Sequence, residues 1–298
     1  MSNQNNHIKL LTYMPTATQE KTSHRKDISR LIKNVPHKPY FEDSKHHVTL
    51  FNKNCFDILP GLPENSVDMI FADPPYFLSN GGFTCHAGRK VSVNKGKWDV
   101  SRGREENYLF TLRWLRECQR ILAPNGTIWV SGTSHIIYTI GYAMQDLGYK
   151  ILNDIAWFKV NPPPNLSCRY FTHSTETILW AAKNKDSKHY FNYALMKRLN
   201  NNKQMLSLWH IKAPGSAEKK YGKHPTQKPL QLLTRIILAS TRRGDIVLDP
   251  FSGSSTTGIA ASREGRQYIG VELEESYLDV SIKRLKDAFR ETGFEYSK

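Results

Sequence analysis

Long apolar runs are missing from the 298-residue sequence. No run approaches the ~20 consecutive apolar residues that a membrane-spanning helix needs. Residues 1–6 are polar and do not resemble the apolar core of a secretion signal. We therefore expect a protein that has no membrane partner and works in the cytoplasm.

Cysteine is scarce. The four residues lie at irregular spacing, at Cys55, Cys85, Cys118 and Cys168. They form no Cys-x-x-Cys pair, and the 11 histidines are scattered, so the ligand spacing of a structural zinc site is missing. The sequence predicts reduced thiols and no metal.

Acidic side chains are few relative to basic ones, with 27 Asp and Glu against 42 Lys and Arg and a net charge of +15. Such an excess favours a polyanionic partner, because Lys and Arg neutralise phosphates. A basic surface that only keeps the protein soluble is the alternative that charge leaves open. No basic amphipathic helix or lipidation signal is present, so nucleic acid is favoured over a membrane surface.

Strand patterns alternate with helical ones along most of the chain, which predicts an α/β fold with a mostly parallel sheet and helices on both faces. Strands are expected at 48–51, 67–72, 127–130, 151–158, 246–248 and 268–271, and helices near 27–32 and at 105–122, 137–147, 230–240, 256–263 and 275–289. The helix expected at 105–122 is stopped by Pro124-Asn125-Gly126. Ligands of such sheets bind at the carboxyl ends of the strands.

The sequence Asp73-Pro74-Pro75-Tyr76 follows one buried strand directly. Each proline lacks an N–H, so the loop offers carbonyl oxygens, together with the Asp73 carboxylate, as acceptors for both hydrogens of an amino group. An aromatic ring at the fourth position can stack on a base that has left its helix. A plain strand-terminating turn is the alternative reading of these four residues alone.

A second loop, residues 247–257, also follows a strand and opens a helix. Gly253 allows close backbone approach, and the Ser/Thr run can cap the helix while N–H groups stay available for a ligand. Glu272 ends the next strand, where acidic side chains commonly bind ribose hydroxyls. The loop has neither G-x-G-x-x-G nor Gly-Lys-Ser/Thr, which disfavours a P-loop NTPase.

The pair D-P-P-Y and D-P-F-x-G-S-x-T-T, with His224-Pro-Thr-Gln-Lys-Pro229 between them, resembles the amino-methyltransferases of DNA. The order of the motifs is similar to the β class, a circular permutation of the Rossmann-like methyltransferase fold that uses S-adenosylmethionine. The resemblance implies four parts: an N-terminal extension (1–46), a catalytic half (47–158), a target-recognition region (159–222) and a cofactor-binding half (223–298).

Carried over position by position, the resemblance implies that Asp73, Pro74, Pro75 and Tyr76 form the catalytic loop around a target adenine, whose N6 receives the methyl group. The implied cofactor set is Asp57, Asp73, His224, Thr226, Lys228, Asp249, Phe251, Gly253, Ser254, Ser255, Thr256 and Glu272. Within it, Glu272 is expected at the ribose, Asp57 near the cofactor's adenine, and residues 224–228 at the methionine end.

Ser255 departs from the family pattern, which has glycine at this position. If the position requires a positive φ, serine imposes strain of about 1 kcal/mol. We expect Ser255→Gly to leave the cofactor affinity equal or better.

DNA contacts are expected from a flexible basic loop at 81–98 and from the start of the recognition region. The residues are Arg89, Lys90, Lys95, Lys97, Asn165, Arg169 and Tyr170. Residues 73–80, 165–173 and 174–180 further resemble the DpnA-type enzymes of bacterial GATC restriction–modification systems. That implies a GATC target, tolerance of single-stranded DNA and a gene of bacterial, phage or plasmid origin.

Other functions remain open at this stage. The nearest enzyme alternative methylates cytosine N4 or an RNA base, and a DNA-binding relative with weak or no turnover is a rival of another class. Related enzymes are often dimers, so the resemblance points to a homodimer. The sequence itself shows no apolar pattern typical of a dimer interface.

Overall fold

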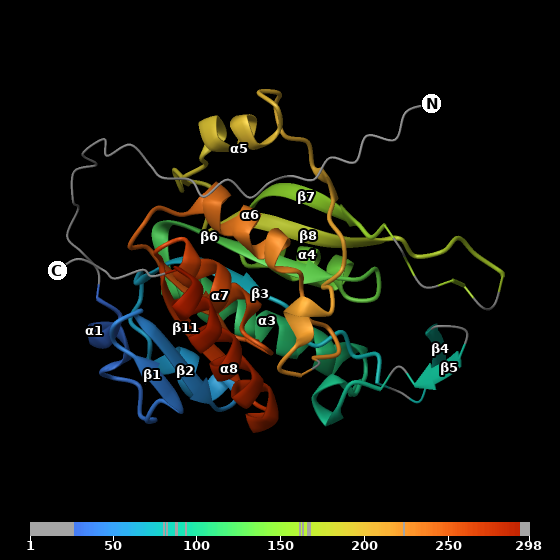
Figure 1. Ribbon diagram of the computed structural model, residues 1–298, viewed down its shortest axis with the longest axis horizontal. Helices are drawn as coiled ribbons and strands as arrows, with labels where there is room; N and C mark the ends of the chain where they lie inside the picture. Colours follow the sequence, from blue (N-terminus) through green and yellow to red (C-terminus); the bar gives the residue numbers. More distant parts are fainter. Residues whose placement is uncertain are drawn as a thin grey trace.

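The protein is described here by a computed structural model (Figure 1). It describes residues 27–292 apart from 80, 82, 87, 88, 93, 161, 163, 166, 167 and 223, with only the backbone of 83–86, 89–91, 291 and 292. Among these residues, no helix is both long and apolar enough to cross a membrane.

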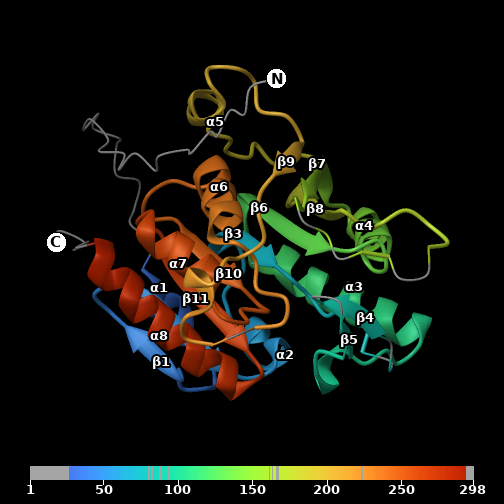
Figure 2. The same cartoon turned by 45° about the vertical axis from the view of Figure 1, so that its right-hand side comes forward.

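One mixed sheet runs through the described part of the chain, in the order β1-β2-β11-β10-β3-β6-β8-β7-β9 (Figures 1 and 2). The strands are β1 (Phe41–Asp43), β2 (Val48–Asn52), β3 (Val67–Ala72), β6 (Leu122–Gly132), β7 (Lys150–Phe158), β8 (Thr175–Ala182), β9 (Leu208–His210), β10 (Ile246–Asp249) and β11 (Gln267–Glu272). The five strands from β2 to β6 are mutually parallel, and β1 and β8 join them antiparallel. The predicted α/β class with a mostly parallel sheet is confirmed.

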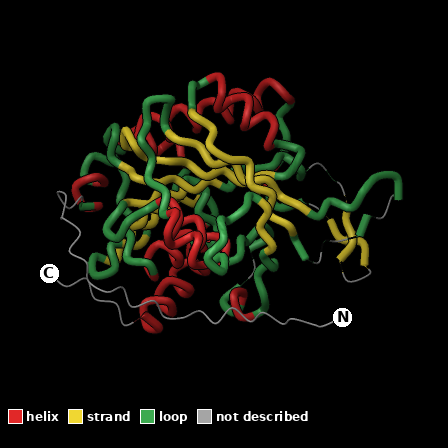
Figure 3. The backbone as a smooth tube through the Cα atoms, turned by 90° about the horizontal axis from the view of Figure 1, so that it is seen from above, coloured by secondary structure: helices red, strands yellow, loops and turns green. Residues whose placement is uncertain are grey.

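Helices cover both faces of this sheet, as the view from above shows (Figure 3). They are α1 (Ile28–Ile32), α2 (Cys55–Ile58), α3 (Arg104–Ile121), α4 (Ile137–Asp146), α5 (Tyr193–Leu199), α6 (Leu230–Ser240), α7 (Thr256–Arg263) and α8 (Glu275–Thr292), with short 3-10 turns η1 (Leu59–Gly61), η2 (Lys97–Asp99) and η3 (Ala217–Lys219). Trp114 of α3 and Ile140 of α4 belong to one apolar core, and Ile236 of α6 and Leu278 of α8 to the other.

Strand β3 contributes side chains to both cores, because successive side chains of a strand point to opposite faces of the sheet. Ile70 and Ala72 belong to the α3 side, and Met69 and Phe71 to the α6 side. This two-sided burial explains the continuous apolar run that the sequence shows before Asp73.

Three strands of this sheet, β1, β8 and β9, were not anticipated from the sequence. Strand β1 pairs with β2, so the sheet begins inside the range predicted as an N-terminal extension. Strand β8 lies between β6 and β7, although its residues fall within the range 159–222 predicted for target recognition. Strand β9, in the same range, pairs with β7, so this range supplies two strands to the sheet.

Residues 124–126, predicted as a turn before a strand, lie within β6 instead. The register of β6 against β3 jumps from the pair Val67–Leu122 to the pair Met69–Thr127, so the intervening residues form an irregularity in a longer strand. The chain can accommodate Pro124 there because a bulged residue needs no ladder hydrogen bond.

The basic loop predicted at 81–98 contains a hairpin. Strands β4 (Phe83–His86) and β5 (Arg89–Ser92) pair antiparallel and form a small separate sheet beside the main body (Figure 2).

The carboxyl ends of β3, β10 and β11 lie side by side, because these strands are parallel neighbours in the sheet. They carry the loop after Ala72, the loop after Asp249 and the side chain of Glu272 to one edge. The topology therefore joins two motifs that are far apart in the sequence.

Candidate active site

The carboxylate of Asp73 is surrounded by donors. Its Oδ1 accepts hydrogen bonds from the hydroxyls of Tyr76 and Ser131, each at 2.6 Å. Its Oδ2 accepts from the ammonium of Lys228 at 2.5 Å. Burial acts to raise the pKa of Asp73, but Lys228 and the two hydroxyls outweigh it and hold the pKa below its ordinary value. Asp73 is therefore ionised at neutral pH.

Lys228 lies between two acidic side chains. Its Nζ is 3.3 Å from the Tyr76 hydroxyl and 3.8 Å from Oε2 of Glu176, in addition to its contact with Asp73. Burial acts to lower the pKa of Lys228, but the two carboxylates outweigh it and raise the pKa. Glu176 also pairs with Lys159 through Oε1. The charges of Asp73, Lys228, Glu176 and Lys159 therefore alternate in sign along a row that ends at Lys159, the residue after β7.

Asp99 fixes the loop that follows the catalytic motif. Its Oδ1 accepts from the N–H groups of Tyr76 and Phe77, and its Oδ2 from the Leu78 N–H and the Ser79 hydroxyl, at distances of 2.7 to 3.2 Å. Phe77 has a φ of 57°, a left-handed conformation that costs energy in a non-glycine residue. The fully buried Asp99 stabilises that conformation.

Lys95 lies inside the site rather than on a solvent-facing loop. Its Nζ is 4.6 Å from the centroid of the Tyr76 ring, a cation–π distance. Burial lowers the pKa of Lys95. The sequence predicted a DNA contact at this residue, and the structure places the ammonium against the ring predicted to stack on a base.

The second loop turns tightly between β10 and α7. Gly253 has a φ of 52°, and a Cβ there would lie 3.1 Å from the His224 ring. Ser255, the N-cap of α7, has a φ of 53° and is fully buried. Its hydroxyl lies 2.8 Å from that of Ser252, which also contacts the Tyr268 hydroxyl. The positive φ on which the strain prediction for Ser255 depends is present.

Arg284 of α8 holds this loop in place by hydrogen bonds to residues 254 and 256. Its Nη1 donates to the Ser254 hydroxyl at 2.8 Å and to the Thr256 hydroxyl at 3.0 Å, and it also contacts the Ser254 carbonyl. Burial lowers the pKa of Arg284 to about 10, which leaves the side chain charged at neutral pH. The guanidinium gives hydrogen bonds to loop oxygens that would otherwise face a low-dielectric interior without a donor.

Three acidic side chains lie near a cavity at the ends of β3, β10 and β11. Burial raises the pKa of Asp249 to about 7, and its hydrogen-bond donors among the described residues, the Thr257 hydroxyl and the Phe251 N–H, are uncharged. Burial also raises the pKa of Glu272, whose Oε2 accepts from the Gly253 N–H at 2.7 Å. A cationic ligand would relieve this accumulation of negative charge.

Most of the predicted cofactor residues converge on this cavity. Those that line it are Asp73, His224, Thr226, Lys228, Asp249, Phe251, Gly253, Ser254 and Thr256. Glu272 lies next to them through Gly253, and Ser255 lies beneath them. Asp57 is exposed on α2, a helix that follows β2, the neighbour of β11 in the sheet. The His224 ring is uncharged at neutral pH, because burial lowers its pKa to about 4.

The predicted DNA contacts lie in three places. Arg89 and Lys90 belong to β5, and their side chains fall outside the described part of the structure. Lys97 is exposed on η2. The Asn165 amide donates to the Tyr170 carbonyl at 2.6 Å, and the side chains of Arg169 and Tyr170 are exposed.

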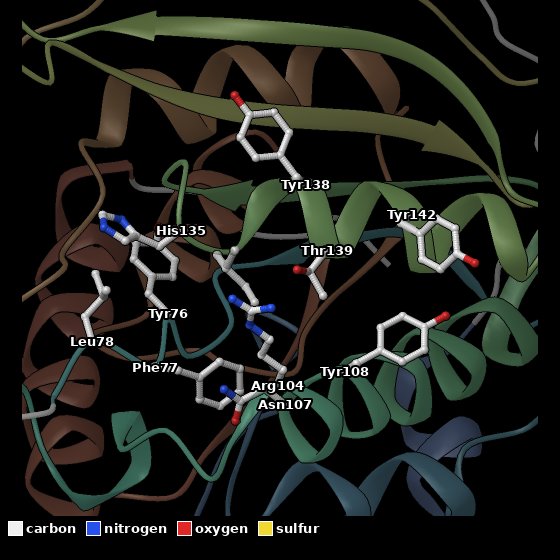
Figure 4. Close-up of a pocket in the computed structure, with 11 residues that line it drawn as sticks. Tyr76, Phe77, Leu78, Arg104, Asn107, Tyr108, His135, Tyr138, Thr139 and Tyr142 are labelled. Atoms are coloured by element: carbon white, nitrogen blue, oxygen red, sulfur yellow. The ribbon is translucent and has the colours of Figure 1, made fainter. Parts of the chain in front are cut away.

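A larger cavity of about 630 Å³ adjoins the catalytic loop on its other side (Figure 4). It lies between Tyr76, Phe77 and Leu78 of the loop and the facing residues of α3 and α4. None of the sequence predictions involved it, apart from Tyr76.

The fold and the two loops define an amino-methyltransferase, and the comparison with known families agrees. The DNA methylase family of the N6/N4 type matches residues 67–283, which include both loops and more than half of the chain. The chain belongs to this family and is a DNA methyltransferase whose cofactor is S-adenosylmethionine.

Close relatives are Type II methyltransferases. M2.DpnII of Streptococcus pneumoniae is 54% identical over 250 residues, covering 84% of this chain and 92% of the relative. M2.MboI of Moraxella bovis is 52% identical over 247 residues, covering 83% and 90%. These proportions show that the likeness extends over nearly the whole of each relative.

Solved structures give the same fold. The M1.HpyAVI–SAM complex is 30% identical with a TM-score of 0.61, over 80% of this chain and 98% of that one. The PvuII DNA methyltransferase, described as cytosine-N4-specific, is 21% identical with a TM-score of 0.67, over 87% and 96%, a likeness that shows the fold alone.

The charges at the cavity fit S-adenosylmethionine, which carries a sulfonium and an α-ammonium group. The buried carboxyl groups of Asp249 and Glu272, whose pKa values burial raises, lie at or beside the cavity, and a bound cation would hold them ionised. Gly253 leaves open the space beside the His224 ring that a side chain would fill. The residues present therefore suit the cofactor in charge and in backbone shape.

Four residues of the site were not selected from the sequence: Asp99, Ser131, Glu176 and Arg284. Ser131 could have been found, because it follows the predicted strand at 127–130 and so lies at a carboxyl end. The other three act on loops distant in sequence and carry no local signal.

Proposed function

We propose that this methyltransferase transfers a methyl group to N6 of adenine in DNA. The observation that carries the proposal is the hydrogen bonding of Asp73. Oδ1 has two hydroxyl donors and Oδ2 has the single donor Lys228, which leaves one acceptor site on Oδ2 among the described contacts. That site suits one hydrogen of an exocyclic amino group, and the Pro74 carbonyl suits the other.

The residues of the catalytic loop have different roles in the proposed reaction. Asp73 and Pro74 hold the amino group and draw its lone pair out of conjugation, so that N6 becomes a nucleophile. Tyr76, with its hydroxyl held by Asp73, offers its ring face to the base. The bound cofactor supplies an electrophilic methyl group, and the residues at 249–256, Glu272 and Lys228 are proposed to hold it.

The proton that N6 loses is proposed to pass to Oδ2 of Asp73. A methylated amino nitrogen that still carries both hydrogens is a far stronger acid than a carboxylic acid, so even a carboxylate of depressed pKa can accept the proton. No covalent intermediate on the enzyme is required, because N6 is itself the nucleophile.

Asp73→Ala is the direct test of this site. We expect transfer of a labelled methyl group to DNA to disappear while calorimetric binding of S-adenosylmethionine persists. A variant that retained turnover would overturn the assignment, and a wild-type protein that bound DNA without transfer would support the inactive, DNA-binding alternative.

We further propose GATC as the target and the segment 159–174 as a reader of it. Support comes from the resemblance of residues 165–180 to DpnA-type enzymes and from relatives that are Type II methyltransferases. Methylome sequencing of a methylation-free host that expresses the protein gives the modified base and its sequence context together. N4-methylcytosine in that experiment would favour the alternative enzyme.

The remaining proposals concern the cellular location and the oligomeric state of the enzyme. Its relatives come from bacteria, which supports a bacterial cytoplasm as its location. A homodimer is retained as a proposal, and sedimentation equilibrium tests it.

A further inference from the structure

The cavity beside the catalytic loop is lined by a set of side chains that we call the tyrosine groove, formed by Arg104, Asn107, Tyr108, His135, Tyr138 and Tyr142. Figure 4 shows Tyr76 and His135 at one end, the rings of Tyr108 and Tyr142 at the other, and the Arg104 side chain between them. The groove therefore continues outward from the site proposed for the target adenine.

The two tyrosines of α4 have no part in the hydrophobic core. Ile137, Ile140, Ala143 and Met144 form the buried face of the helix. Tyr138 is 77% exposed and Tyr142 is 62% exposed on the opposite face, one helical turn apart. Folding does not require large aromatic side chains at these exposed positions.

The ring geometry and polar groups suit a polynucleotide. The rings of Tyr108 and Tyr142 lie 5.8 Å apart at 40°, and the Tyr108 hydroxyl is fixed by Asp146 at 3.3 Å. The exposed rings of Tyr138 and Tyr142 and the exposed Arg104 side chain are the elements of a single-strand site, in which bases stack on aromatic faces and phosphates contact cations. Asn107 and His135 add groups that can hydrogen-bond a base edge.

We propose that the tyrosine groove binds the unpaired nucleotides next to the target adenine, stacking their bases on Tyr138 and Tyr142 and pairing a phosphate with Arg104. This inference rests on the proposed function, because it takes the adenine at Tyr76 as its starting point. The geometric support is that Tyr76 and Phe77 of the catalytic loop line the same cavity, so the tyrosine groove is continuous with the proposed adenine site.

The test uses the full-length protein and single-stranded oligonucleotides that contain one GATC. A series carries a single abasic residue at each position that flanks the target adenine. Methyl transfer is measured for the wild type, for Tyr138→Ala/Tyr142→Ala, and for Tyr138→Phe/Tyr142→Phe, which retains the rings.

For the alanine pair we expect the KM for intact oligonucleotide to rise about tenfold or more, because stacking contributes roughly 1–3 kcal/mol per base. We expect kcat to change little. The abasic residue that most impairs the wild type should no longer matter to the alanine pair, and the phenylalanine pair should behave as the wild type.

Tyr40, an exposed tyrosine just before β1, lies outside both the groove and the predicted recognition region and provides a control, since Tyr40→Ala should leave the KM unchanged. An unchanged KM in the alanine pair overturns the proposal. If the pair also shifts from dimer to monomer in sedimentation, the groove is instead an interface between copies of the chain. Failure of the proposed function is distinct, because the wild type itself would then transfer no methyl group to the adenine of any oligonucleotide.

Discussion

Among single residues, Lys228 has the largest effect on the proposed reacting carboxylate. It contacts Asp73 at 2.5 Å within a buried site, and its charge opposes the effect of burial. Removing the cation leaves only the hydroxyls of Tyr76 and Ser131 to oppose the effect of burial on the carboxyl group.

Lys228→Met should therefore raise the pKa of Asp73 and protonate it at higher pH. We expect the acidic limb of the kcat/KM profile to move upward by about one to three pH units, the usual effect of an adjacent opposite charge. The profile is measured by labelled methyl transfer, with Lys220→Met as a control because Lys220 is half exposed and pairs with Asp287. An unchanged acidic limb would show that Lys228 does not control this ionisation.

Ser255 can be tested with two substitutions that separate strain from hydrogen bonding. Ser255→Gly relieves roughly 1 kcal/mol of left-handed strain but loses the hydroxyl contact with Ser252, worth a similar amount, so stability should change little. Ser255→Ala keeps the strain and loses the contact, so it should destabilise the fold by about 1 kcal/mol or more. Urea unfolding measures both, and calorimetry should show cofactor affinity in the glycine variant equal to or better than that of the wild type.

Among elements, the catalytic loop depends on a carboxylate contributed by η2. Asp99 accepts four hydrogen bonds from residues 76–79, and an amide in its place would turn an NH2 group toward some of these donors.

Asp99→Asn should loosen the loop and lower kcat by about 10- to 100-fold, the effect of losing hydrogen bonds to a charged group. The cofactor loop lies on another strand, so binding of S-adenosylmethionine should persist in calorimetry. Asp186→Asn, at an exposed position, is the control and should retain full activity. Full activity in Asp99→Asn as well would show that the loop holds its shape without this carboxylate.

The local motifs could be located from the sequence because each is contiguous and follows a strand with an evident apolar pattern. The helix α6 and the helix α7 have the predicted bounds. Strand β8 was missed because a polar, aromatic-containing stretch precedes it, and β1 because three residues carry too little pattern. Glu176 belongs to β8 and was missed for the same reason.

The long-range contacts of the site could not be read from the chain. Asp99 meets the loop after β3, and Arg284 meets the loop after β10, only because the sheet and its helices bring them together. Lys95 was assigned to DNA from its charge, and its place against Tyr76 depends on the fold of the segment around it. Sequence spacing fixes none of these three relationships.

For the whole molecule, the net charge of +15 predicts a strong dependence of DNA binding on salt. If Arg89, Lys90, Lys97 and Arg169 each neutralise one phosphate, affinity should fall by about 50- to 150-fold between 50 and 200 mM salt. Fluorescence anisotropy measures this slope, and replacing any one of the four by Met should lower it by about one charge. A flat dependence would exclude a phosphate-based interface.

The order of the sheet has a consequence for synthesis of the protein. Strands β11 and β10 come last in the chain but lie between β2 and β3, which are among the first. A nascent chain that has exposed only residues up to 245 already contains Asp73–Tyr76, yet β2 and β3 still lack the neighbours that separate and align them. The sheet therefore closes only after the final strands have left the ribosome, so unfinished chains carry no assembled site.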